Sequence, residues 1–424
     1  MAKKIPVSPF APRKVPALPP VAGVHLATIA SQSRYSGRDD VLLIGLENGA
    51  RVAGVFTRSK TASAPIDLCR AHLRASKGRI GALVVNAGNA NAFTGAAGAK
   101  AAAAIAQASA DKCGCAGAQV FVASTGVIGE LLDAKPIIAG IKQANLVPPK
   151  AAHWQAAMQA IMTTDTFPKA ASVRAKFGDQ TVTLNAIAKG SGMIAPDMAT
   201  MLAFIFTDAA IPARLLQKLL QEAVAASLNC ITVDSDTSTS DTCLLVATGK
   251  KRLTGGGLTS INDKRLKNFR HALAQLCQKI AVQIVGDGEG ISKLMTIDVA
   301  GAENDQAARR IGLAVGNSPL VKTAIAGEDA NWGRIIMAVG KSGERVDRDR
   351  LSLDIGGHRV ARRGRVVANY QERRVATHLK KSHIHIAIGV GAHINKNKIG
   401  KGKARVWASD LTHGYIDING DYRS

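Results

Sequence analysis

Apolar residues recur along this chain with two different periods, and the two periods separate expected strands from expected helices. Between residues 21 and 60, apolar and polar residues alternate, which predicts short antiparallel strands joined by turns such as Glu47-Asn48-Gly49. Short apolar runs predict buried strands at residues 80–87, 119–124, 182–188 and 201–206. Helical spacing and helix-forming composition predict helices at residues 96–110, 151–162, 212–228 and 264–284. Beyond residue 345, strand-like segments with charged alternation dominate.

Strands and helices therefore mix without a regular strand–helix–strand rhythm. This order predicts an α/β, layered, two-part fold with mixed or antiparallel sheets flanked by helices, in preference to a doubly wound parallel sheet. A length of 424 residues, 46% of them hydrophobic, is sufficient for two domains or one large two-part fold.

The N-terminal residues 1–22 are basic and rich in proline, and they lack the apolar segment of a secretion signal. We expect a flexible arm there. No apolar run approaches the roughly 18 residues that a membrane span needs, so we expect a cytoplasmic protein.

One segment carries the strongest chemical signal. Residues 189–208 read KGSGMIAPDMATMLAFIFTD, in which a glycine-rich loop leads to Ala199-Thr200 and then directly into an apolar strand. A threonine hydroxyl is a weak nucleophile that needs an adjacent base, and the threonine's own α-amine can serve. That amine has a pKa of about 7.7 to 8, but it exists only if the peptide bond before Thr200 is cut.

This segment resembles the cleavage and nucleophile motif of the ornithine acetyltransferase family, also called glutamate N-acetyltransferases, of arginine biosynthesis. Further blocks resemble the family in the same order: AGVFTRSKTASAP (53–65), NAGNANAFTG (86–95), ASTGVIGE (123–130), IMTTDT (161–166), ITVDSDTSTSDT (231–242), AGEDANWGR (326–334) and INGDYRS (418–424). The resemblance covers residues 20 to 424 approximately, and its specificity comes from the ordered set of blocks.

The resemblance implies that the chain cuts itself between Ala199 and Thr200. It then consists of an α chain, with a body from residue 23 to 199, and a β chain, residues 200–424, that begins with the nucleophile. The pair Thr125-Gly126 matches the family's oxyanion hole, in which the hydroxyl and the amide are the donors. Fixed donors aimed at a developing negative oxygen lower the barrier by a few kcal/mol.

The resemblance also assigns the contacts to the substrate. The matching substrate-binding positions are Thr163, Lys189, Thr200, Glu289, Asn419 and Ser424. Glu289 suits an ammonium group such as that of ornithine, and Lys189 suits a carboxylate. The family often ends in threonine where this chain has Ser424; both residues keep a hydroxyl and a terminal carboxylate.

The implied reaction passes an acetyl group from N2-acetyl-L-ornithine to L-glutamate through an acetyl-threonine, giving ornithine and N-acetylglutamate. It requires no metal and no organic cofactor. Some members of the family also accept acetyl-CoA as donor, and the sequence leaves that activity open. The family implies a heterotetramer of two α and two β chains.

Alternative interpretations of other features are weaker. A self-processed N-terminal-nucleophile aminopeptidase or amidohydrolase would share Thr200 but pass the acyl group to water. The formal net charge of +24 suits a nucleic-acid-binding surface, but few aromatic residues accompany the late basic run, so we expect no nucleic-acid partner. The resemblance does not explain this charge.

Three local motifs are also better explained without a cofactor. The glycines of residues 286–290 follow a predicted helix and precede a strand, the reverse of a dinucleotide-binding loop. Asp234 faintly resembles a phosphatase nucleophile, but a hydrogen-bonded turn is the simpler explanation. The six cysteines are scattered along a long chain without a secretion signal, so we expect no disulfides. Cys113 and Cys115 have no second pair at a zinc-binding spacing, so we expect no metal site there.

Overall fold

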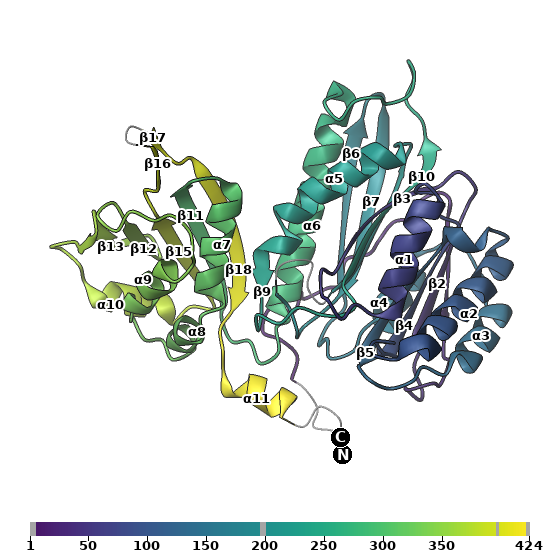
Figure 1. Cartoon of the computed structure of the whole chain (residues 1–424), viewed down its shortest axis with the longest axis horizontal. Helices are drawn as coiled ribbons and strands as arrows, with labels where there is room; N and C mark the ends of the chain where they lie inside the picture. Colours follow the sequence, from purple (N-terminus) through teal and green to yellow (C-terminus); the bar gives the residue numbers. More distant parts are fainter. Residues whose placement is uncertain (1–5, 196–200, 396–397, 421–424) are drawn as a thin grey trace.

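The computed structural model describes residues 6–195, 201–395 and 398–420. Within these residues, two sheets and their helices form one body, and a third sheet with further helices forms a lobe beside it (Figure 1). The α/β class with mixed and antiparallel sheets flanked by helices is therefore confirmed.

The first sheet has four strands in the order β1-β2-β4-β5, with β4 and β5 parallel and the other neighbours antiparallel. Its strands are β1 (Val24–Ile29), β2 (Val41–Leu46), β4 (Ala82–Asn89) and β5 (Val120–Val127). Helices α2 (Gly95–Cys113) and α3 (Ala134–Gln143) pack on its outer face. Every residue of β2 and β4 is buried because both faces of the sheet are covered, which explains their continuous apolar runs.

The second sheet has five strands in the order β3-β10-β8-β7-β6. Its strands are β3 (Arg51–Phe56), β6 (Lys169–Phe177), β7 (Gln180–Lys189), β8 (Leu202–Ala209) and β10 (Thr242–Lys251). One face packs against the first sheet around Phe121, Phe204 and Phe206, with Trp154 of α4 (Ala151–Ala160) joining that layer. The other face packs against α5 (Ala213–Ala225) and α6 (Lys267–Gly286). The body is thus a helix–sheet–sheet–helix sandwich.

The hairpin predicted around Glu47-Asn48-Gly49 is wrong in its pairing. The turn follows β2 and precedes β3, but β2 pairs with β1 and β4, whereas β3 pairs with β10 in the other sheet. The alternating pattern identified both strands correctly. Their partners are set by burial between the two sheets, which the local sequence does not encode.

The third sheet has seven strands in the order β14-β13-β12-β15-β11-β18-β9. They are β9 (Ile231–Thr232), β11 (Leu294–Ala302), β12 (Ser352–Ile355), β13 (His358–Arg362), β14 (Arg365–Val366), β15 (His383–Gly389) and β18 (Gly402–Ser409). A small separate ribbon consists of β16 (His393–Asn395) and β17 (Lys398–Ile399).

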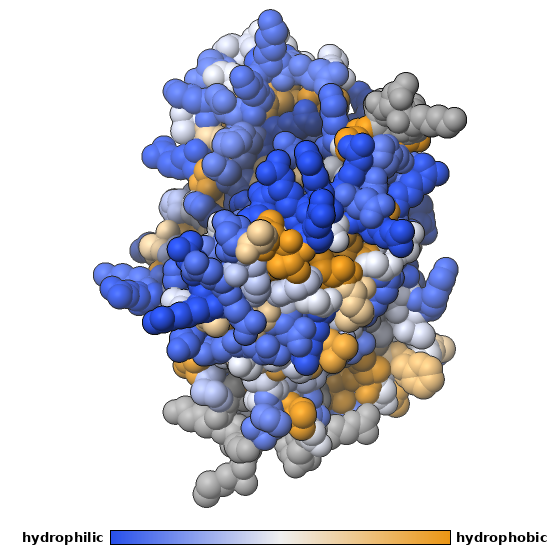
Figure 2. Space-filling model, turned by 90° about the vertical axis from the view of Figure 1, so that its left-hand side faces the viewer, coloured by the Kyte–Doolittle hydropathy of each residue, from blue (hydrophilic) through white to orange (hydrophobic). Residues whose placement is uncertain are grey.

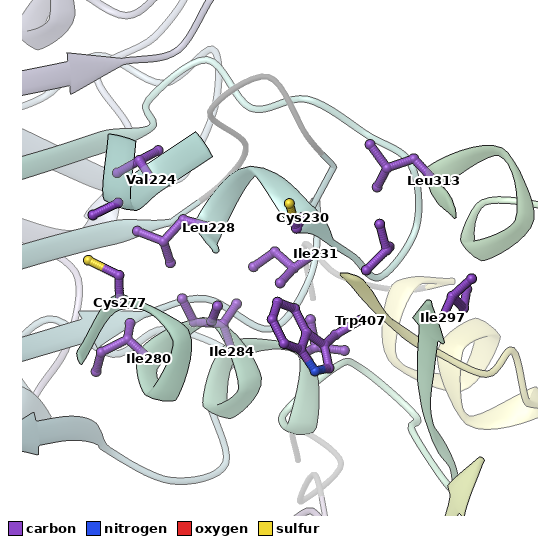
Figure 3. Packing of buried hydrophobic residues seen from close by; sticks show 14 of the residues in the cluster. Val224, Leu228, Cys230, Ile231, Cys277, Ile280, Ile284, Ile297, Leu313 and Trp407 are labelled. Atoms are coloured by element: carbon purple, nitrogen blue, oxygen red, sulfur yellow. The ribbon is translucent and has the colours of Figure 1, made fainter. Parts of the chain in front are cut away.

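This lobe joins the body through apolar contacts. Figure 3 shows Ile231 and Trp407 between Ile284 of α6 on one side and Ile297 of β11 on the other. Because β9 forms the edge strand of the third sheet and follows α5 after one short 3-10 helix (Leu228–Cys230), the core of the body continues into the lobe.

The predicted helices 96–110, 151–162, 212–228 and 264–284 correspond to α2, α4, α5 and α6. The pattern missed several helices: α1 (Ala64–Ala75), α3, α7 (Asp305–Gly316), α8 (Pro319–Ala326), α9 (Gly333–Gly340), α10 (Glu372–Leu379) and α11 (His413–Asn419). Most of these are one to three turns long, and such short helices depend on tertiary packing more than on their own sequence.

Hydrophilic side chains cover most of the outer face of the lobe (Figure 2). The exposed residues Arg362, Arg363 and Arg365 of the β13–β14 hairpin lie in this lobe, so part of the late basic run is a solvated surface. In the described parts of the chain, no helix is both long and apolar enough to cross a membrane. Residues 6–22 have neither helix nor strand, and Leu18 and Val21 are buried.

Candidate functional site

A cavity of about 510 Å³ lies where the ends of strands from both sheets of the body meet the α11 segment. Its lining includes six of the residues expected from the sequence: Thr125, Gly126, Thr163, Lys189, Glu289 and Asn419. They come from positions spread over nearly three hundred residues of chain. A larger hollow of about 780 Å³ in the lobe is lined mainly by surface arginines and glycines and contains none of these groups.

One direct contact in this cavity joins Lys189 and Thr125. Lys189 ends β7, and its Nζ donates to Thr125 Oγ1 of β5 at 2.8 Å. Because an ammonium group can only donate, the threonine oxygen accepts, and its own O–H hydrogen remains available for another acceptor. Lys189 is only 5% exposed, and burial lowers its pKa, although the charge of Asp165 opposes that change.

Glycine is required at position 126 by the packing of two strands. Gly126 has a φ of +135°, and a Cβ atom there would lie 2.2 Å from the Gly88 carbonyl carbon of β4. Any other residue would push β5 away from β4. The sequence ASTGVIGE therefore places a threonine with a fixed backbone at the cavity wall.

Thr163 is positioned by a buried ion network that the sequence did not reveal. Asp165 accepts from the Thr163 amide (3.0 Å) and from the Gly190 amide (2.7 Å). Lys169 Nζ lies 2.6 Å from Asp165 Oδ1 and 2.6 Å from Asp287 Oδ2, and all three side chains are completely buried. One lysine thus ties the Thr163 loop and the residue after Lys189 to the end of α6.

Opposite effects act on the two carboxyls of this network. Burial favours a raised pKa for Asp165, but Lys169, Lys189 and the Gly190 amide outweigh it and bring the pKa to about 2. Burial raises the pKa of Asp287, and Lys169 only partly offsets it. The two pKa values therefore move in opposite directions, although both carboxyls contact the same Lys169 ammonium.

Glu289 and Asn419 form the other side of the cavity. Asn419 Nδ2 donates to Glu289 Oε2 at 2.8 Å, which connects α11 with the loop after α6. The Glu289 carboxylate lies directly against the backbone of Gly192, because a Cβ at residue 192 would lie 2.3 Å from its Oε2. The carboxylate keeps one oxygen, Oε1, outside this bond, so it can accept from a cationic ligand.

Asp234 is a hydrogen-bonded turn residue, as expected, and it also lines the cavity. Its carboxylate accepts from the amides of Met193, Ile194 and Asp236, and Tyr415 Oη donates to it at 3.3 Å. Burial raises its pKa, and the three amides oppose this. The order helix, glycines, strand around residues 286–290 is likewise confirmed by α6 and β11.

Three of the expected residues, Ala199, Thr200 and Ser424, lie outside the described residues. The described chain resumes at Met201, whose amide donates to Asp241 Oδ1 at 2.9 Å. In the parts that the structure describes, no cluster of three or more His, Cys, Asp or Glu could hold a metal ion, and the six cysteines are free thiols.

Comparison with known proteins shows the family of this chain. The ArgJ family model matches residues 25–424. The chain belongs to the ArgJ family. Two relatives, each named arginine biosynthesis bifunctional protein ArgJ, come from Mesorhizobium japonicum and Agrobacterium fabrum. They are 50% identical over 422 residues and 51% identical over 419 residues, and each alignment covers 99% of both chains.

Among solved structures, the chain is similar to ornithine acetyltransferase of Mycobacterium tuberculosis complexed with ornithine. That match has 30% identity and a TM-score of 0.37, and it covers 42% of this chain and 93% of the other.

The residues of this ArgJ-family chain that sequence reasoning missed share one property. Lys169 and Asp287 contact each other across 118 positions, and Asp241 contacts Met201 across 40. An isolated lysine or aspartate in a strand or after a helix has no local signature of such a partner. Asp165 lies two positions after Thr163, and Asp287 lies two positions before Glu289, so only their nearness to selected residues could have drawn attention to them.

Proposed function

We propose that this chain is a glutamate N-acetyltransferase that moves an acetyl group from N2-acetyl-L-ornithine to L-glutamate. The observation that carries the proposal is the convergence of Thr125, Lys189, Glu289 and Asn419 on one cavity in a chain that belongs to the ArgJ family throughout. The names of the relatives place them in arginine biosynthesis, which agrees with an exchange between these two amino acids.

The first step is hydrolysis of the peptide bond between Ala199 and Thr200: water adds to the Ala199 carbonyl carbon, the carbon–nitrogen bond breaks, and the Ala199 carboxyl and the α-amine of Thr200 are freed. The described strands support survival of the two fragments as one molecule. In the second sheet, β3, β7 and β6 precede the cut, whereas β10 and β8 follow it, and the order β3-β10-β8-β7-β6 interleaves them. Separating the fragments would break this sheet and expose its apolar faces to water.

The acyl transfer is a double displacement. Thr200 Oγ forms a bond to the acetyl carbon as the α-amine accepts the hydroxyl proton. The bond from that carbon to the ornithine nitrogen then breaks, and the proton passes to this nitrogen. The amine of glutamate next attacks the acetyl-threonine ester; the carbon–oxygen bond breaks and Oγ recovers a proton.

The cavity residues suit the charges that these steps create. Thr125 can donate its free hydroxyl hydrogen to the oxyanion, since Lys189 occupies only the acceptor side of that oxygen. Gly126 supplies the second donor from its amide. Lys189 has further hydrogens for a substrate carboxylate, and Glu289, oriented by Asn419, suits the side-chain ammonium of ornithine.

The test combines the mass of the denatured protein with the initial rates of acetyl transfer. The denatured protein should give two masses, those of residues 1–199 and 200–424, and initial rates should give the parallel double-reciprocal lines of a ping-pong reaction. Thr200→Ala should remain one chain and lose transfer. An active, uncleaved Thr200→Ala protein would refute the mechanism.

Two variations of the same assay define the acceptor and donor. Rapid release of acetate without glutamate would favour a self-processed hydrolase over a transferase. The relatives are named bifunctional, and we propose acetyl-CoA as a second donor; transfer from acetyl-CoA to glutamate without acetylornithine tests this. We also propose that the protein is cytoplasmic. We further propose that it assembles as a heterotetramer of two α and two β chains, and the native mass of the processed protein tests this assembly.

A further inference from the structure

Asp241 is a completely buried carboxylic acid at the junction of three strands. It directly precedes β10, and its Oδ1 accepts from the amide of Met201, the residue before β8, at 2.9 Å. Its backbone carbonyl accepts from the amide of Thr57, just beyond β3 (3.0 Å). The Thr242 amide in turn donates to the Met201 carbonyl at 3.1 Å, so both backbone polar groups of Met201 are hydrogen-bonded.

The burial of this carboxyl is costly, and the Met201 amide compensates only one of its two oxygens. Oδ2 has no hydrogen-bond partner among the described residues, and the nearby Thr57 hydroxyl donates instead to the Ser238 carbonyl at 2.6 Å. Burial raises the pKa of Asp241 well above its usual range, and the charge of Lys189 opposes this. An apolar residue would avoid the cost of burying the carboxyl, but it would leave the buried Met201 amide without its acceptor.

We propose that Asp241 is a positioning residue that fixes the nucleophile through the peptide group of Met201. The inference rests on the proposed function, because it takes Thr200 as the nucleophile. A peptide unit is planar and includes the α-carbon of the preceding residue. Fixing the Met201 N–H therefore orients the bond that leads to the α-carbon of Thr200.

Both reactive groups of Thr200 are attached close to that carbon. The α-amine is one covalent bond away from it and the hydroxyl oxygen is two. After cleavage, the Met201 amide is the first backbone N–H of the new chain, and chain ends fray unless a contact holds them. Since a displacement of about 1 Å can cost about 100-fold in rate, an anchor at this amide matters for catalysis.

The experiment compares two substitutions at Asp241 with a matched control. Asp241→Asn keeps an oxygen that can accept from the Met201 amide, and Asp241→Ala removes it. Asp208 is the control: it is 6% exposed, lies at the far end of the same strand β8, and also accepts a backbone amide, that of Thr183, at 2.9 Å. Each variant is assayed for cleavage and, in its processed fraction, for kcat and KM with acetylornithine and glutamate.

We expect Asp241→Ala to lower kcat by about 100-fold with KM changed only a few-fold, because a misplaced nucleophile affects the chemical step. Asp241→Asn should keep most of the wild-type kcat, and Asp208→Ala should keep all of it. Wild-type kcat in Asp241→Ala, equal losses in the alanine and asparagine variants, or an equal loss in Asp208→Ala would each overturn the inference.

Hydrogen exchange provides a readout even if Asp241→Ala does not fold. In the folded wild type and in Asp241→Asn, the Met201 amide should be protected to the same degree; free exchange of this amide in the wild type would overturn the inference. An uncleaved wild type without transfer activity would instead refute the proposed function. If the wild type is active and the Asp241 variants have the same kcat and KM as the wild type, only the role of Asp241 is refuted.

Discussion

The substitution Lys169→Met tests whether the buried ion network holds the protein and its site together. Methionine keeps the length and apolar character of the side chain but removes the ammonium. Asp165 and Asp287, both completely buried, then lose a charge partner at 2.6 Å each. Removing one partner of a buried ion pair typically costs about 3–5 kcal/mol, because an uncompensated charge remains in the interior.

This cost is a substantial fraction of the stability of most proteins, which is about 5–15 kcal/mol. We expect Lys169→Met to lower the free energy of unfolding by about 3–5 kcal/mol. Urea denaturation followed by tryptophan fluorescence measures it, since Trp154 is buried in the core of the body. The measurement is made in the Thr200→Ala background, in which we expect a single chain, so that unfolding does not include dissociation of two fragments.

A neighbouring lysine provides the matched control. Lys176 lies on the same strand, β6, but is exposed, so Lys176→Met should change the free energy of unfolding by no more than about 0.5 kcal/mol. A loss below about 1 kcal/mol for Lys169→Met would show that the network contributes little and would refute the reasoning. In processed protein, Lys169→Met should also raise KM, because Asp165 holds the Thr163 and Gly190 amides.

Two further predictions concern the cavity and a second buried lysine. Thr125→Ala should lower kcat by about 100- to 1,000-fold while Thr125→Ser keeps most of it; equal activities in steady-state assays would remove the hydroxyl from the oxyanion hole. Burial lowers the pKa of Lys322 to about 8, below its unfolded value of about 10.4. From pH 8 to 10 the unfolded state therefore binds more protons, and the wild type should gain up to about 3 kcal/mol relative to Lys322→Met. A difference in urea stability that is independent of pH would contradict this.

The sequence by itself determined the elements whose signal is local. The repeat of Leu215, Leu216, Leu219 and Leu220 specifies α5, because residues at this spacing share one face of a helix. The apolar run before Asp208 specifies β8 in the same way. The order of motifs also selected Thr125, Lys189, Glu289 and Asn419, and these residues meet in one cavity.

Tertiary structure alone decided which of these elements and charges are partners. Strands β2 and β3 flank one turn yet belong to different sheets, and Lys169 contacts Asp287, which directly follows α6 and is 118 residues away. The carboxyl of Asp241 meets Met201 only because β8 and β10 are parallel neighbours. A local pattern fixes which side of an element is buried, because periodicity is a property of a short segment. It does not fix what lies against that side, since that depends on the burial and the charge balance of the whole folded chain.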